Sequence, residues 1–165
     1  MKHLDLLQLI KIDRSVARSV NLDRDFDDTS LLNRFQITPV ACSTLCRLAD
    51  AIEGESINAW SLTGPYGTGK SAFCNFLIAL SCADQTTRNL CYKKLQKADK
   101  KLSTRLKTFL APDSTSAPAI GIRAVSRYES LNSTLVRGLS SSLQLMPTHS
   151  ESAALKRLRK NVSLL

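Results

Sequence analysis

One feature constrains the fold of this chain more than any other: the segment 64–71, with the sequence GPYGTGKS. It fits the phosphate-binding pattern G-x-x-x-x-G-K-[ST] at every fixed position. Glycines let the backbone curl so that successive N–H groups face phosphate oxygens, and the helix that follows adds its unpaired N–H groups and the positive end of its dipole. In this pattern the lysine, here Lys70, reaches the outer phosphates, and the hydroxyl of the serine, here Ser71, coordinates Mg²⁺.

The residues on either side of this segment predict the local structure that a phosphate loop requires. Residues 57–63 are apolar at positions 57, 59, 60 and 62, which is typical of a short buried strand. Residues 71–80 are mostly apolar and predict a buried helix. Strand, glycine-rich turn and helix is the arrangement in which this motif binds phosphate, whereas an ordinary glycine turn needs no lysine and serine at these positions. The predicted nucleotide-binding residues are Gly64, Pro65, Tyr66, Gly67, Thr68, Gly69, Lys70, Ser71 and Ala72, and Ser71 is also the predicted metal ligand.

Length and composition limit the class of protein. The chain has 165 residues, enough for one modest domain, and its apolar content is ordinary for a folded protein. No apolar run approaches the roughly eighteen residues of a membrane span. Residues 1–7 include an acid and are soon followed by Asp13 and Arg14, unlike a signal peptide. We therefore expect a cytoplasmic protein that makes no use of a membrane.

Positive charge is concentrated in the later part of the chain. Residues 1–55 hold seven Lys and Arg against nine Asp and Glu, whereas residues 56–165 hold sixteen against five. This bias favours anionic partners such as a nucleotide or a nucleic acid. Residues 85–110 form an expected helical region that is rich in these cations. It is either a surface helix with a solvated basic face or an arm that contacts nucleic acid or a partner.

The cysteines form an odd set without a C-x-x-C pair: Cys42, Cys46, Cys74, Cys82 and Cys91. Cys42 and Cys46 are four residues apart and would share one face of a helix. A zinc site would need two further ligands, and the only histidines, His3 and His149, are far away in the sequence. Reduced, buried thiols are the better interpretation. The acidic segment 23–30 is interpreted as a solvated loop, because its spacing matches no calcium-loop pattern.

Helix signals are clearest ahead of the phosphate loop. Thr38 as N-cap and Pro39 at the first position begin a helix that reaches Ile52 and stops at Gly54. Residues 4–19 fit either a helix or a strand followed by a polar turn.

Further elements are expected after the basic region. Residues 112–118 have the composition of a loop, and residues 119–125 predict a second strand. Ser130 can cap a helix that continues to Leu143, and residues 153–161 predict a short basic helix.

Hydrolysis of a nucleotide needs a second carboxylate, normally at the end of another apolar strand, to hold the Mg²⁺ shell. The acids after Ser71 are Asp84, Asp99, Asp113, Glu129 and Glu151, and none of them ends such a strand. A nucleotide-binding sheet usually has about five parallel strands covered by helices, more than this sequence offers. We therefore predict an incomplete three-layer α/β fold with a parallel sheet. Residues 1–37 would form an N-terminal helical segment, and residues 38–165 a nucleotide-binding domain that ends before its carboxylate strand.

The run 38–52 followed by 59–71 resembles the start of the large P-loop ATPases of the AAA+ and STAND type, in which a capped helix precedes the strand and a G-P-x-G-x-G-K-S loop. The resemblance covers roughly residues 35–82. It implies that segment 64–71 is a Walker A loop that binds ATP and Mg²⁺, and that residues 35–39 lie near the adenine. The family's hydrolytic Asp-Glu pair and sensor region have no counterpart here, so the resemblance supports ATP binding more than hydrolysis. Members of this class often form oligomers and act on DNA.

Three functions follow as hypotheses. The leading one is an ATP-binding module that is the front part of an ATPase acting on DNA, and ATP is preferred to GTP because no N-K-x-D motif is present. The second is a nucleic-acid-binding protein that uses its basic half as the binding surface. The third is a small-molecule phosphotransferase with region 85–110 as a lid, although no convincing catalytic base accompanies it.

Overall fold

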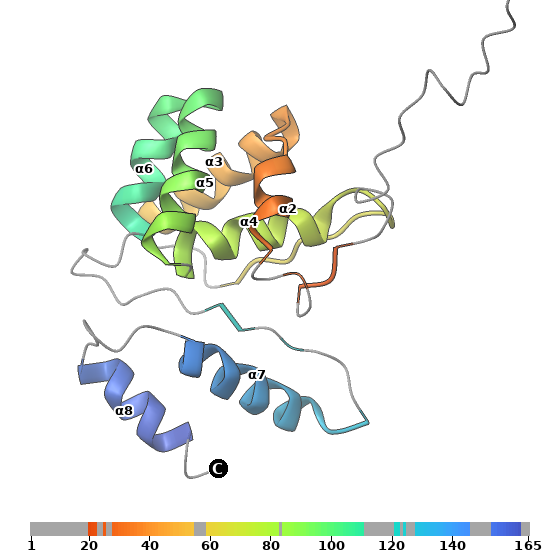
Figure 1. Ribbon diagram of the computed structural model, residues 1–165, viewed down its shortest axis with the longest axis vertical. Helices are drawn as coiled ribbons and strands as arrows, with labels where there is room; N and C mark the ends of the chain where they lie inside the picture. Colours follow the sequence, from red (N-terminus) through yellow and green to blue (C-terminus); the bar gives the residue numbers. More distant parts are fainter. Residues whose placement is uncertain are drawn as a thin grey trace, which may run out of the picture.

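The computed structural model describes residues 20–22, 25, 28–54, 59–82, 84–110, 121–122, 124, 128–145 and 153–162. All the regular structure within these ranges is helical (Figure 1). The helices are α2 (Thr29–Arg34), α3 (Pro39–Glu53), α4 (Lys70–Cys82), α5 (Gln85–Ala98), α6 (Lys100–Leu110), α7 (Leu131–Leu145) and α8 (Ala153–Val162).

The predicted α/β fold with a parallel sheet is therefore wrong, because the described residues contain no strand. Residues 59–65 have no regular structure, and the apolar side chains that suggested a buried strand there are half exposed: Trp60 at 41 % and Leu62 at 42 %. The Trp60 ring lies against Arg47 of α3, whose guanidinium carbon is 5.3 Å from the ring centroid. A strand needs a neighbour that pairs its backbone N–H and C=O groups. The expected partner at 119–125 lies mostly outside the described residues.

The helix signals ahead of the loop are confirmed by α3. The Thr38 hydroxyl oxygen accepts a hydrogen bond from the Ala41 N–H at 3.2 Å, Pro39 occupies the first helical position, and Gly54 is the C-cap. The helices expected at 71–80, after Ser130 and at 153–161 are confirmed as α4, α7 and α8.

Asp99 divides the expected helical region 85–110 into the antiparallel pair α5 and α6. Its backbone is extended, with φ −152° and ψ 106°, and its carboxylate accepts a hydrogen bond from the Leu102 N–H at 2.9 Å. Asp99 thus ends one helix and caps the next. The acidic segment 23–30 differs from the predicted solvated loop in two respects. Asp28 caps α2 by accepting from the Ser30 N–H at 2.9 Å, and Asp25 is only 2 % exposed and accepts from the Asn21 N–H at 2.9 Å. The expected element at 4–19 lies outside the described residues.

Helices α2 to α6 enclose one apolar core, and α7 packs against α8 (Figure 1). The core side chains include Leu45 from α3, Phe76 from α4, Leu95 from α5 and Leu106 from α6, none of which is exposed to solvent. The Phe76 ring stacks on Phe35, with ring centroids 4.7 Å apart. This packing fixes α4, the helix that begins within the predicted phosphate loop, at Lys70.

Candidate phosphate-binding loop

The predicted phosphate loop is an exposed turn that leads directly into α4. Gly67 and Gly69 both have φ of 82°, in the left-handed region that side chains rarely adopt. A Cβ placed on either residue would meet nothing within 4 Å, so backbone conformation rather than crowding explains the glycines. Figure 1 shows the chain reversing direction between the segment that precedes the loop and α4. Gly69, which the pattern fixes, and Gly67, at a variable position of the pattern, therefore both occupy backbone conformations that favour glycine.

The Lys70 side chain folds back over the loop. Its ammonium group donates to the carbonyl oxygen of Gly64 at 2.8 Å and to that of Pro65 at 2.6 Å. The Thr68 hydroxyl donates to the same Pro65 carbonyl at 2.9 Å. A lysine ammonium has three protons, so these two carbonyls leave one proton with which it can reach a phosphate oxygen. The loop thus holds a positive charge at its centre.

The start of α4 supplies backbone donors beside that charge. Gly69 occupies the N-cap position, and its carbonyl oxygen accepts from the Phe73 N–H at 2.9 Å. The N–H groups of Lys70, Ser71 and Ala72 precede the first helical hydrogen bond and have no acceptor within the helix. Glycine has no side chain that could accept from them. These N–H groups and the helix dipole favour an anion at this end of α4.

Exposure and anchoring differ along the motif. Residues 64–69 and Ser71 are exposed, and the Tyr66 side chain is 91 % exposed. One turn further along α4, Phe73 is half-buried and Phe76 is fully buried in the core. The loop is accessible to a ligand, while its C-terminal side is fixed by packing.

The structure places every predicted nucleotide-binding residue in this one turn and first helical turn. Ser71, the predicted Mg²⁺ ligand, is the second residue of α4. In the segment expected near the adenine, Phe35 and Ile37 pack against the apolar core, and Thr38 caps α3. Those two apolar side chains therefore have packing roles.

The acids that follow the loop in the described part of the chain have structural partners. The Asp84 carboxylate accepts from the N–H groups of Thr86 and Thr87 at 2.8 and 3.1 Å and caps α5. Hydrogen bonding by Thr87 lowers the pKa of Asp84. Asp99 caps α6, and Glu129 pairs with Arg137 of α7. Asp113 and Glu151 lie outside the described residues.

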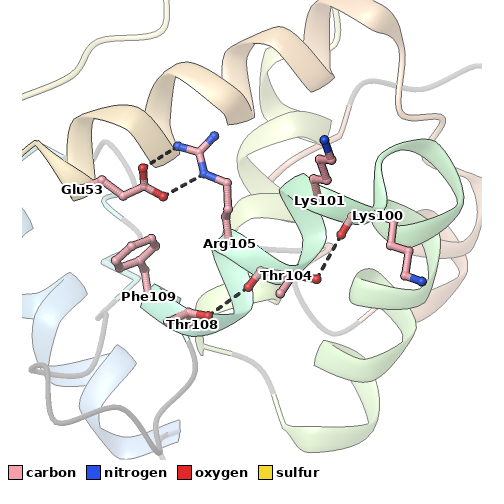
Figure 2. Close-up of a pocket in the computed structure, with 7 residues that line it drawn as sticks. All are labelled: Glu53, Lys100, Lys101, Thr104, Arg105, Thr108 and Phe109. Carbon is pink, nitrogen blue, oxygen red and sulfur yellow. Dashed lines mark hydrogen bonds and ion pairs between the residues drawn. The ribbon is translucent and has the colours of Figure 1, made fainter.

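The basic region forms one side of a groove of about 580 Å³ beside α6 (Figure 2). Arg105 is not free to bind a ligand there, because its guanidinium donates to both carboxylate oxygens of Glu53 at 2.7 Å and to Asp50 at 2.6 Å. This bidentate pair lowers the pKa of Glu53. Lys100 and Lys101 point away from the pair, and both are exposed.

A second cluster of side chains joins two cysteines named in the sequence analysis to a carboxylate that sequence reasoning did not connect with them. The Cys42 and Cys46 thiols of α3 lie near the Asp99 carboxylate, with one ligand atom from each residue within 4.8 Å of the other two. Burial, followed by the neighbouring Cys46, raises the pKa of the Cys42 thiol. The four-residue spacing predicted that the two cysteines share a face, but nothing local signalled the distant Asp99.

Comparison with known protein families, curated proteins and solved structures finds no match to the chain. Within the described ranges, no helix has the length and apolar character needed to cross a membrane.

Proposed function

We propose that this protein binds MgATP through residues 64–72. The observation that carries the proposal is the position of the Lys70 ammonium, which is held by the Gly64 and Pro65 carbonyls beside the free N–H groups of α4. A helical core does not exclude such a site, because the donors come from the turn and the first turn of one helix. The motif, the glycine conformations and the lysine position agree with one another.

In this proposal each part of the loop has a separate task. The backbone N–H groups and Lys70 bind the phosphates, and the exposed Ser71 hydroxyl completes the Mg²⁺ coordination. ATP is preferred to GTP because the sequence has no N-K-x-D motif. Because Asp84, Asp99 and Glu129 have structural partners, a catalytic carboxylate would have to come from residues other than these, and we propose binding rather than hydrolysis. A cytoplasmic location would supply the ATP.

The proposal is tested by calorimetric titration of MgATP into the wild-type protein and into Lys70→Ala. Removing a charged hydrogen-bond donor costs about 1.5–3 kcal/mol, so we expect the affinity to fall by about 10- to 100-fold. Lys94→Ala is the matched control. The Lys94 ammonium also donates to a backbone carbonyl, that of Asn33 at 2.6 Å, but Lys94 lies on α5, outside the loop. Equal affinity of Lys70→Ala and wild type, or an equal loss in the control, would refute the role of Lys70.

A second candidate function is nucleic-acid binding by the α5–α6 pair. Exposed lysines are found along both helices, at Lys93, Lys97, Lys100, Lys101 and Lys107. Lys100 and Lys101 lie in the first turn of α6, where the helix dipole adds to their positive charge. This concentration of exposed cations favours the interpretation that the α5–α6 pair binds a polyanion. A face that only contacts solvent would be expected to carry acids among its cations.

Fluorescence anisotropy with labelled DNA at several salt concentrations tests this second candidate. Each lost phosphate contact should reduce the slope of log K against log salt by about 0.9, so the double variant Lys100→Gln, Lys101→Gln should reduce it by about two. The matched control changes two exposed cations of α8, Lys156→Gln and Arg157→Gln. Absence of DNA binding at low salt, or the same slope in both double variants, would exclude this surface.

A further inference from the structure

The thiol–carboxylate cluster of Cys42, Cys46 and Asp99 brings together three side chains from two parts of the chain. The cysteines lie four residues apart on one face of α3, and Asp99 occupies the junction between α5 and α6. One ligand atom from each of the three lies within 4.8 Å of the other two, and all three residues are partly buried.

The carboxylate is already oriented by the fold. Its Oδ1 atom accepts from the Leu102 N–H at 2.9 Å, which holds the Asp99 side chain at the start of α6. A carboxylate has two oxygens, so the hydrogen bond to the helix leaves one oxygen that can bind a metal ion. Metal ligands are commonly positioned by a hydrogen bond of this kind.

The donor set selects the class of cation. Two thiolates and one carboxylate favour a soft or borderline ion such as Zn²⁺ over Mg²⁺ or Ca²⁺, which prefer oxygen ligands. With Zn–S near 2.3 Å and Zn–O of about 2.0–2.2 Å, the ligand atoms of a tetrahedral site lie about 3.3–3.8 Å apart. The three ligand atoms lie within 4.8 Å of one another, so their separations would have to shorten by at most about 1.5 Å to reach this geometry.

We propose that Cys42, Cys46 and Asp99 bind a thiophilic divalent cation of the Zn²⁺ type, with water as the fourth ligand. The bound ion would replace the two thiol protons and connect α3 to the α5–α6 junction. This site is separate from the phosphate loop, and its metal differs from the Mg²⁺ expected there.

The test uses the reduced full chain and Zn²⁺, with affinity measured by competition against a chromophoric zinc chelator. We expect one Zn²⁺ to bind per chain, and expect Cys42→Ser and Cys46→Ser to weaken binding by at least about 100-fold. Asp99→Asn preserves an N-cap, because asparagine caps as well as aspartate, and should weaken binding by about 10-fold. Cys74→Ser removes another partly exposed thiol, on α4, and Asp84→Asn changes the corresponding cap of α5; neither should alter affinity.

A second readout needs no variant. Bound Zn²⁺ should protect Cys42 and Cys46 from alkylation, while Cys74 stays reactive. The extent of alkylation at each cysteine is measured by mass spectrometry of the digested protein. The proposal is overturned if the wild type binds no Zn²⁺ at micromolar concentration, or if Cys74→Ser weakens binding as much as Cys42→Ser. Equal protection of all three thiols, or formation of a Cys42–Cys46 disulfide in place of a zinc complex, would also overturn it.

Discussion

Replacing Gly67 by alanine tests whether the loop conformation itself binds phosphate. Gly67 has φ of 82°, and a Cβ at this position would meet nothing within 4 Å. The substitution therefore introduces backbone strain without a steric clash inside the protein. Holding an L-residue in the left-handed region costs about 1–2 kcal/mol.

The location of Gly67 determines which quantity that strain changes. The loop is exposed, so the variant can relax to another turn without disturbing the core. A smaller fraction of molecules then has the binding conformation, and the apparent dissociation constant rises in proportion. A cost of 1–2 kcal/mol corresponds to an affinity lower by a factor of about 5–30. The free energy of unfolding should stay close to that of the wild type.

Gly67→Asn is the matched control, because asparagine adopts the left-handed region more readily than alanine. In calorimetric titration with MgATP, the affinity of the asparagine variant should lie within about threefold of the wild-type affinity. The affinity of the alanine variant should be well below both. Thermal unfolding followed by circular dichroism should be the same for all three proteins. The reasoning is refuted if Gly67→Ala binds like the wild type, or if alanine and asparagine weaken binding equally.

Three further predictions concern the core and the contacts around it. Phe76→Ala removes a fully buried ring that stacks on Phe35, and urea denaturation should show a loss of about 3–5 kcal/mol. Because Arg105 lowers the pKa of Glu53, the ion pair between them stabilises the fold at pH values above 4.5, the ordinary pKa of a glutamate. This stabilisation is lost as the pH falls through the lowered pKa. Arg105→Gln should therefore lower the urea midpoint at neutral pH, and the midpoint of this variant should decrease less than that of the wild type as the pH is lowered below 4.5. Parallel plots of midpoint against pH for the two proteins would contradict this. Asn75 is 2 % exposed, and its Oδ1 has no hydrogen-bond partner among the described residues, so Asn75→Leu should leave urea stability unchanged or raise it. A loss above about 2 kcal/mol would show that this amide is satisfied in solution, for example by a buried water.

The elements predicted from the sequence are those with local causes. Thr38 and Pro39 determine the start of α3 through one side-chain hydrogen bond and one fixed φ, and both signals lie in adjacent residues. The turn ahead of α4 was predictable for the same reason, because Gly67 and Gly69 are needed for backbone conformation whatever surrounds them. MgATP binding itself stays a prediction.

The features that could not be predicted depend on distant partners. Residues 57–63 have the apolar composition of a buried strand, but burial requires a covering surface, and Trp60 lies against Arg47 while remaining 41 % exposed. Composition alone could not show whether a sheet would form around this segment. Likewise, Cys42 and Asp99 are brought together only by the packing of α3 against α6, so the sequence offered two metal ligands where the structure offers three.

The contacts of α3 show how the loop is connected to the rest of the molecule. On its C-terminal side the loop continues into α4, which Phe76 fixes in the core. On its N-terminal side the contact of Trp60 with Arg47 joins the preceding segment to α3. The same helix carries Cys42 and Cys46 and provides Glu53 to Arg105 of α6. Displacing Trp60 would therefore break its contact with Arg47 of α3, whereas the Arg105–Glu53 pair and the proposed metal ion would hold α3 against α6.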